Sequence, residues 1–246
     1  MIEGKQKIVL QIVRITNGIR EGFEEYSILA DRFTTVLDAL LDVRENQNSS
    51  IQFRYSCRMG MCGSCGMKIN RKPRLACQTL ISQVGTVIKI EPMDHLPIIR
   101  DLVPYLDEFF LKYKSVKPYL IEKSKEYQDH PSTMNKQYEW QIMEYLSSNY
   151  CIQCALCYSA CPIVGSDKNY LGPAALNVAF RYTADSRDTG ARYRLEIVSG
   201  EEGTSRCHFV GECTEVCPKE VNPSYSIQKL RGKMVKEELK NVYGGN

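Results

Sequence analysis

Eleven cysteines constrain this chain more than any other feature, because they fall into three short runs and no cysteine lies outside them. The runs have the spacings C-x4-C-x2-C-x11-C, C-x2-C-x2-C-x3-C-P and C-x5-C-x3-C-P. Their members are Cys57, Cys62, Cys65 and Cys77 in the first run, Cys151, Cys154, Cys157 and Cys161 in the second, and Cys207, Cys213 and Cys217 in the third. We interpret the rest of the chain as a scaffold for these runs.

Disulfides and structural zinc are the alternatives to iron–sulfur ligation at these cysteines. An odd count and an N-terminus without the apolar core of a secretory signal argue against a disulfide framework. Zinc sites do use C-x2-C pairs. However, the first spacing is typical of plant-type [2Fe–2S] ferredoxins, and the second is typical of bacterial cubane-cluster ferredoxins. The spacings therefore favour iron–sulfur clusters.

The composition is that of a soluble globular protein, with 43% apolar and 25% charged residues. A length of 246 residues suffices for two domains, each with its own core. A transmembrane helix needs about 20 nearly uncharged residues, and the richest candidate, residues 102–111, contains Asp107 and Glu108. We therefore expect the chain to stay on the cytoplasmic side, so that any membrane association must come through partners.

The first hundred residues have the pattern of a β-grasp domain. In order, we expect a hairpin over 7–15 and 23–30, a helix over 36–44, the cysteine loop 55–65, a hairpin around 70–72 and a strand over 86–90. Asn17-Gly18 is a turn signal, and Thr35 with Asp38 has the spacing of a capping box. Residues 1–104 are predicted to form a plant-type [2Fe–2S] ferredoxin domain.

Two features of the first cysteine run concern its cluster. Gly60, Gly63 and Gly66 interleave with the cysteines, and we expect them to supply the positive φ angles that let a loop wrap a cluster.

Between Glu45 and Glu91 there is no acidic residue. The basic residues there are Arg54, Arg58, Lys68, Arg71, Lys72, Arg74 and Lys89. We expect these cations to stabilise the reduced form of the cluster or to bind an acidic surface of a partner protein. The alternative is that they form a basic face exposed to solvent. A net charge of only +3 without a recognition motif argues against nucleic acid.

The second half is predicted to be α-helical around the remaining seven cysteines. Helices are expected over 134–146, 173–182, 191–198 and 223–240. Pro173 and Pro223 stand at first helical positions of two of them. The chain is therefore predicted to be an α+β protein, with a β-grasp domain followed by an α-helical, bacterial-type two-cluster ferredoxin domain over residues 105–246.

The seven cysteines can be sorted into two clusters. In two-cluster ferredoxins, the fourth cysteine of a C-x2-C-x2-C-x3-C-P run binds the other cluster. This rule assigns a [4Fe–4S] cluster to Cys151, Cys154, Cys157 and Cys217, and a [3Fe–4S] cluster to Cys161, Cys207 and Cys213. The missing corner of the second cluster falls at Val210, midway between Cys207 and Cys213, because an apolar side chain cannot ligate iron.

The stretches SCRMGMCGSCG, CIQCALCYSACP and CHFVGECTEVCPKEVNP, with LGPAALNVAFRY and DSRD, resemble the iron–sulfur subunit of succinate dehydrogenase/fumarate reductase over nearly the whole chain. The resemblance implies electron relay between covalently bound FAD on a flavoprotein subunit and a quinone at a membrane anchor subunit. It implies that the [2Fe–2S] domain faces the flavoprotein and that the [3Fe–4S] cluster lies nearest the quinone. FAD, and any haem, would belong to partner subunits.

Departures from the family pattern concern the quinone. Ubiquinone-linked members carry tryptophan at the position of Ser166, whereas Gln228 matches a glutamine of menaquinone-linked fumarate reductases. Arg231 stands where those enzymes carry lysine, and His208 matches dehydrogenase-type members. His208, Gln228 and Arg231 are thus candidate quinone-pocket residues, and menaquinone or another low-potential quinone is favoured. The alternative for Gln228 and Arg231 is the polar face of a helix.

No nucleophile–base pair, phosphate loop or catalytic carboxylate dyad is recognisable in the sequence, so this chain is expected to conduct electrons without bond chemistry of its own. Two other functions compete with the relay subunit of a membrane complex. One is a stand-alone polyferredoxin, which a flavoprotein bound in fixed stoichiometry would exclude. The other is the relay subunit of a soluble fumarate reductase or glycolate-oxidase-type enzyme, whose relatives often carry extra cysteine-rich modules.

Overall fold

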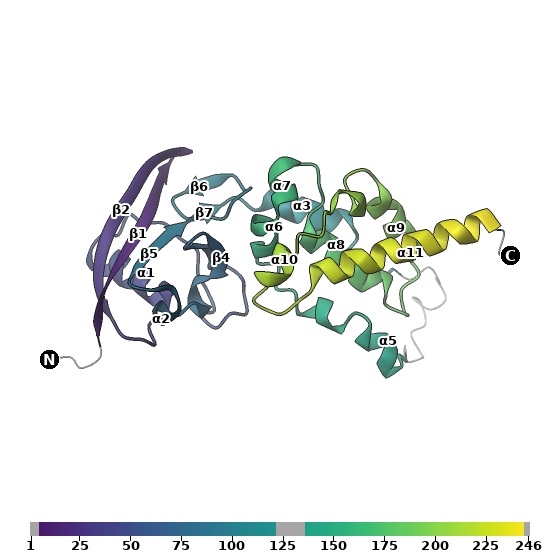
Figure 1. Ribbon diagram of the computed structural model, residues 1–246, viewed down its shortest axis with the longest axis horizontal. Coiled ribbons are helices and arrows are strands. Elements are labelled where there is room, and N and C mark those ends of the chain that lie inside the picture. Colours follow the sequence, from purple (N-terminus) through teal and green to yellow (C-terminus); the bar gives the residue numbers. More distant parts are fainter. Residues whose placement is uncertain (1–4, 122–135, 244–246) are drawn as a thin grey trace, which may run out of the picture. The chain divides into compact units, whose positions relative to one another are not determined.

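The computed structural model describes residues 5–121 and 136–243. The chain forms two compact units, one of residues 1–107 with 152–160 and one of residues 108–151 with 161–246. In the described ranges, the first unit holds the strands and the second holds most of the helices (Figure 1). The short segment 152–160, from the second cysteine run, packs with the first unit.

A five-stranded mixed sheet forms the centre of the first unit. Its strands are β1 (Gln6–Thr16), β2 (Ile19–Ala30), β3 (Gly66–Ile69), β4 (Lys72–Leu75) and β5 (Val87–Glu91). Their order is β2-β1-β5-β3-β4. The central pair, β1 and β5, is parallel, with Val9 opposite Val87, and the other pairs are antiparallel. The predicted α+β fold is confirmed, whereas the parallel pairing was not expected from the sequence.

Two tight turns explain the hairpins β1–β2 and β3–β4. Asn17 and Gly18 have φ angles of 51° and 77°, and Asn70 and Arg71 have φ angles of 47° and 70°. Two consecutive left-handed residues match the right-handed twist of hairpin strands. Asparagine tolerates this conformation better than most residues. Both predicted hairpins are confirmed.

The predicted capping box begins helix α1 (Val36–Asn46). The Thr35 hydroxyl accepts the N–H of Asp38 at 3.1 Å, and the Asp38 carboxylate accepts the N–H of Thr35 at 3.0 Å. The helix buries one apolar face, formed by Val36, Leu37, Ala39, Leu40, Leu41 and Val43. It contacts β2 and the 3₁₀ turn η1 (Ala76–Gln78). Helix α1 therefore covers the sheet at the point where the first cysteine run ends.

A buried carboxylate connects β1 to two loops of the first unit. The side chain of Asp101 is fully buried and accepts hydrogen bonds from Nε of Arg14 at 3.0 Å and from the N–H groups of Ile15 and Gln52. Burial lowers the pKa of the Arg14 guanidinium. The hydrogen bonds from Arg14 to Asp101 and Glu24 raise this pKa by more, so the net shift is upward. Asp101 also has a positive φ angle of 45°. The sequence did not predict this conformation, because the position has neither a glycine nor a turn signal.

Smaller elements complete the first unit. They are α2 (Ile81–Val84), the strand pair β6 (Ile98–Arg100) and β7 (Val103–Pro104), and α6 (Leu156–Ala160). Helix α6 contacts β4. The hydroxyl of Ser159 accepts the N–H of Asp94 at 2.8 Å. Residues from the second cysteine run are thus part of the framework that surrounds the first.

Helices form the second unit. They are α3 (Asp107–Ser115), α5 (Glu139–Met143), α7 (Pro162–Ser166), α8 (Pro173–Thr183), α9 (Ala191–Ser199), α10 (Glu212–Glu215) and α11 (Pro223–Tyr243), with 3₁₀ turns η2 (Leu146–Tyr150) and η3 (Thr204–Arg206). Helix α8 is almost entirely buried and contacts both α9 and the long helix α11 (Figure 1). The helices predicted near 173, 191 and 223 are confirmed, each slightly longer than expected.

The helix predicted over 134–146 is wrong in extent. Residues 134 and 135 lie outside the described residues, and the described remainder forms only α5 followed by η2. No side chain of α5 is buried. Because most helical stability in proteins comes from packing one apolar face, an exposed segment with aromatic residues does not extend beyond a short turn.

Two aspartates of the segment between α8 and α9 bind arginines. The buried carboxylate of Asp185 accepts from Arg181 and Arg187 at 2.9 and 2.8 Å. Hydrogen bonds from Arg187 lower its pKa, although burial acts in the opposite direction. The side chains of Asp188 and Arg194 are both fully buried and pair at 2.6 Å. The DSRD stretch therefore stabilises the fold around α8 and α9.

Within the described residues, no helix combines the length and the apolar character needed to span a lipid bilayer.

The Asp101 site gives a stability prediction. Replacing Asp101 with alanine should lower the free energy of opening at β1 by about 3 kcal/mol, because Arg14 loses its buried partner. Amide hydrogen exchange in β1 should then be more than about a hundredfold faster. Asp42, on the exposed side of α1, accepts a hydrogen bond from the Asn46 side chain at 2.9 Å. Asp42→Ala is the control, expected to change the free energy of opening at β1 by less than about 0.5 kcal/mol. Equal exchange in the two variants would contradict the role of Asp101.

Candidate metal centres

The loop of the first cysteine run directs backbone N–H groups at sulfur atoms. The Sγ atom of Cys57 accepts the N–H groups of Met59, Met61 and Cys62 at 3.3–3.4 Å. In turn, the N–H of Cys57 donates to Sγ of Cys62 at 3.5 Å. At the other end of the run, the N–H of Cys77 donates to Sγ of Cys65 at 3.5 Å. Such N–H groups stabilise negative charge on the sulfurs of Cys57, Cys62 and Cys65, as ligation of a cluster by these thiolates would require.

Glycines allow this loop to take its shape, although not all in the expected way. Gly60 and Gly63 have φ angles of 71° and 73°, as predicted. Gly66 has no positive φ angle, so that part of the prediction is wrong. A Cβ atom on Gly66 would lie 3.2 Å from Leu156, and one on Gly63 would lie 2.8 Å from Cβ of Cys154. Gly63 and Gly66 therefore permit close packing of the loop against the segment 152–160.

The thiols of the first run differ in their acidity. The Ser64 hydroxyl, with backbone N–H groups near it, lowers the pKa of the exposed Cys62 thiol to about 6. Burial raises the pKa of the Cys65 thiol to about 12, and the nearby Cys77 thiol acts in the same direction. Cys62 is therefore the more acidic of these two thiols, and a metal's positive charge would favour loss of the proton from Cys65.

The basic stretch is only partly available to a partner or a cluster. Lys68 pairs with Asp94 at 2.6 Å, and Lys89 lies 3.9 Å from Glu91. Arg58, next to Cys57, is exposed and lies over the ring of Tyr55. The positive charge closest to the first cysteine run along the chain is therefore that of Arg58.

The second cysteine run begins after η2. Cys151 directly follows η2, Cys157 lies in α6, and Cys161 precedes α7. The residues on either side of Cys154, Gln153 and Ala155, have φ angles of 55° and 62°. These left-handed residues give the backbone the sharp bends that glycines give in the first loop. Sequence analysis missed them, because neither residue type signals a positive φ angle.

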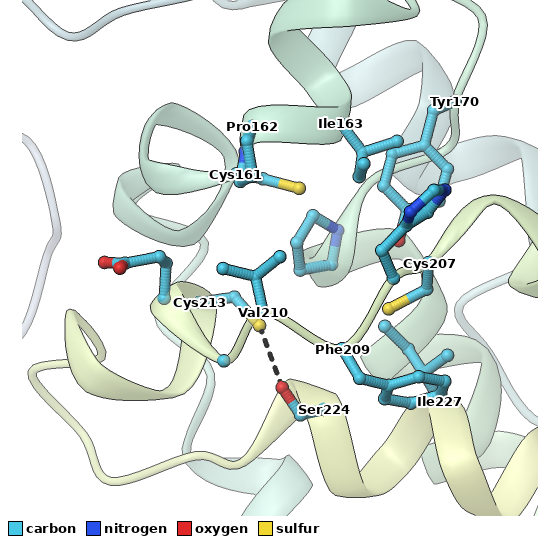
Figure 2. Close-up of a pocket in the computed structure, with 14 residues that line it drawn as sticks. Cys161, Pro162, Ile163, Tyr170, Cys207, Phe209, Val210, Cys213, Ser224 and Ile227 are labelled. Carbon is cyan, nitrogen blue, oxygen red and sulfur yellow. Dashed lines mark hydrogen bonds between the residues drawn. The ribbon is translucent and has the colours of Figure 1, made fainter.

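Three cysteines of the second unit surround one hollow (Figure 2). The sulfurs of Cys161, Cys207 and Cys213 face it from different segments, and the side chain of Val210 points into it between them. The hollow is partly open to solvent, and its empty space, open solvent included, is about 320 Å³. Its other lining residues include Ile163, Tyr170, Pro173, His208, Phe209, Ser224 and Ile227. The fold thus brings the three cysteines predicted to bind one cluster together with Val210, the residue predicted at its missing corner.

Two of the three thiols at this hollow, those of Cys161 and Cys213, are buried, whereas Cys207 is half-buried. Burial raises the pKa of the Cys161 and Cys213 thiols. At Cys213, the hydroxyl of Ser224 acts in the opposite direction. Burial also raises the pKa of Tyr170, whose hydroxyl interacts with Cys207. Soft thiolate ligands in a mostly apolar pocket fit an iron–sulfur cluster held by three cysteines, since thiolates prefer such clusters to hard cations.

The candidate quinone residues have different surroundings. His208 lines the hollow and is exposed, and Gln228 is exposed on α11. The Arg231 guanidinium donates to the carbonyl groups of Thr204 and Cys207, at 3.1 and 2.9 Å, and lies over the ring of Phe209. Arg231 therefore holds the chain that carries Cys207, a role that the sequence did not reveal.

The comparisons with known proteins agree with these two kinds of site. Residues 9–111 match the family described as a 2Fe-2S iron-sulfur cluster binding domain, and residues 147–221 match a 4Fe-4S dicluster domain. A fumarate reductase iron-sulfur subunit of Haemophilus influenzae is 40% identical over 86% of this chain and 86% of its own. The chain belongs to the family of fumarate reductase iron–sulfur subunits.

Further relatives support this membership. The fumarate reductase iron-sulfur subunit of Mycobacterium tuberculosis is 37% identical and covers 96% of each chain. A solved structure of the Mycobacterium smegmatis Sdh1 complex in the apo form contains a chain with the same fold, at a TM-score of 0.85 and 22% identity over 96% of this chain and 98% of that one. The [2Fe–2S] and [4Fe–4S] clusters predicted from the spacing are thus confirmed at the level of the family.

Gly63 allows a test of the close packing at the first cysteine run. Gly63→Ala should destabilise the loop and lower its iron content, because the new Cβ atom meets Cys154 at 2.8 Å. We expect a cost of about 1–3 kcal/mol beyond the strain of the left-handed backbone. Gly18→Ala is the matched control, since Gly18 has a similar φ angle of 77° and no atom within 4 Å of its Cβ position. Equal loss of iron in both variants, by absorbance and iron analysis, would count against this packing role.

Proposed function

We propose that this chain is the electron-relay subunit of a succinate:quinone oxidoreductase, conducting between the FAD of a flavoprotein subunit and a membrane quinone. The observation that carries the proposal is the convergence of Cys161, Cys207 and Cys213 on one hollow that Val210 also lines. Bound iron–sulfur clusters supply one-electron chemistry. The residues of this chain hold the clusters, shield them from water and set their local charge.

The proposed ligand sets follow the sequence. A [2Fe–2S] cluster is held by Cys57, Cys62, Cys65 and Cys77, a [4Fe–4S] cluster by Cys151, Cys154, Cys157 and Cys217, and a [3Fe–4S] cluster by Cys161, Cys207 and Cys213. The N–H groups at Cys57 and the three sulfurs at the hollow support the first and third sets. We also propose that residues 1–104 form the [2Fe–2S] domain and that residues 105–246 form the domain with the other two clusters.

The proposed partners are an FAD-containing flavoprotein and one or more membrane anchor subunits, with the chain peripheral on the cytoplasmic face. Names of the similar proteins support a multisubunit complex, since two are iron–sulfur subunits of fumarate reductase. Menaquinone or another low-potential quinone is the proposed acceptor, and exposed His208 and Gln228 are its candidate contacts. Arg231 acts there through the Cys207 segment, to which its guanidinium is bonded.

The function can be tested by isolating the chain from its own cells. We expect a flavoprotein in a fixed 1:1 ratio, a hydrophobic subunit in the membrane fraction, and reduction of all three clusters by succinate. A soluble monomer whose clusters succinate cannot reduce would instead support the stand-alone ferredoxin.

The missing corner gives a sharper prediction. Oxidised wild-type protein should show the EPR signal of a [3Fe–4S] cluster. Val210→Cys adds a thiolate at the fourth corner, so this cluster should take up a fourth iron, lose the three-iron signal and have a lower potential. Iron analysis and EPR redox titration measure these changes.

Glu212→Cys is the matched control for this substitution. Glu212 also lines the hollow, but it does not occupy the midpoint between Cys207 and Cys213. Glu212→Cys should retain the three-iron signal. An unchanged signal and potential in Val210→Cys would refute the assignment of Val210 to the missing corner.

A further inference from the structure

The sulfur of Cys213 at the hollow has a serine hydroxyl beside it. The Oγ atom of Ser224, near the start of α11, lies 3.3 Å from Sγ of Cys213 (Figure 2). Cys213 is only 7% exposed, so little water competes for its sulfur. In such a low-dielectric environment, a hydrogen bond is electrostatically stronger than at the surface.

The direction of this hydrogen bond follows from the chemistry of a metal-bound cysteine. A thiolate bound to iron has no proton and can only accept, so Ser224 must be the donor. The Thr214 hydroxyl lies 3.0 Å from Oδ1 of Asn222, which can only accept, and 3.3 Å from Oγ of Ser224. Thr214 therefore donates to Asn222. The anionic sulfur is a better acceptor than the Thr214 oxygen, so the Ser224 proton points to Cys213.

The backbone holds Ser224 in this position. Oδ1 of Asn222 accepts the N–H of Tyr225 at 2.9 Å, as an N-cap does, and Pro223 is the first residue of α11. The Ser224 hydroxyl is therefore aimed at the sulfur by the fold, with little reorganisation needed when the charge changes.

We propose that Ser224 raises the reduction potential of the cluster bound by Cys213, by donating a hydrogen bond to its Sγ atom. The inference rests on the proposed ligand set, in which Cys213 binds iron. Reduction adds one electron, supplied along the relay, and hydrogen bonds to the sulfurs are among the features that set cluster potentials. The hydrogen bond stabilises the more negative reduced form more than the oxidised form.

The test is an EPR redox titration of the intact complex. Ser224→Ala should reduce the equilibrium constant for one-electron reduction of this cluster about tenfold. This corresponds to a midpoint potential lower by about 59 mV. Ser224→Thr keeps a hydroxyl on the same carbon and should retain the wild-type potential. Iron content shows that each variant still holds its clusters.

Ser226→Ala is the matched control. It removes a serine hydroxyl two residues away on the same helix, but that hydroxyl contacts oxygen atoms of Asn177, Ser148 and Asn222. Ser226→Ala should leave the midpoint potential unchanged. An unchanged potential in Ser224→Ala, or an equal decrease in Ser226→Ala, would overturn the role of Ser224.

A separate variant distinguishes failure of this inference from failure of the ligand set. Cys213→Ala should remove the [3Fe–4S] signal and leave the signals of the other two clusters. If all three clusters persist in Cys213→Ala, the ligand set itself is wrong, and the role of Ser224 falls with it. If the cluster is lost there but Ser224→Ala has the wild-type potential, only the inference about Ser224 is wrong.

Discussion

Several sulfur atoms that bind one cluster must come close together, and every other part of the structure depends on meeting this constraint. Thiolates repel one another, and burying them costs free energy unless donors and metal offset their charge. In the first run, backbone N–H groups at Cys57 and Cys65 provide the donors. At the hollow, burial and the neighbouring thiols raise the pKa of the Cys161 and Cys213 thiols. Backbone N–H groups at Cys161 and side-chain hydroxyls at Cys213 act in the opposite direction.

Buried or bonded arginines hold irregular loops in both units, and one of these loops carries Cys207. Arg14 and Asp101 join β1 to neighbouring loops in the first unit. Arg194 pairs with Asp188 in the second unit, and Arg231 binds the carbonyl groups of the Cys207 segment. A guanidinium has five donors in a fixed plane, so one side chain can satisfy several groups of an irregular loop. The loops therefore keep their shape although regular secondary structure is scarce around the cysteines.

The hollow of the second unit combines two features with opposite accessibility. Val210 is 58% exposed, whereas Cys213 beside it is buried. An apolar residue at the fourth corner leaves three sulfur ligands, and the Ser224 hydroxyl approaches one of them. In the function that we propose, this cluster is the one nearest the quinone. The potential of this cluster then depends on two things: the number of its cysteine ligands and the hydrogen bonds to its sulfurs. Different residues of the chain, Val210 and Ser224, control the two.

Local patterns in the sequence determined much of this protein. Cysteine spacing indicated the cluster types, Thr35 and Asp38 predicted a helix start that forms as a capping box, and Asn17-Gly18 predicted a turn with two left-handed residues. These features depend on neighbours within a few positions. Tertiary structure alone decided the parallel pairing of β1 with β5, the approach of Gly63 to Cys154 and the contact of Ser224 with Cys213. Those contacts join residues far apart along the chain or on separate elements, and packing, which no local pattern encodes, brings them together.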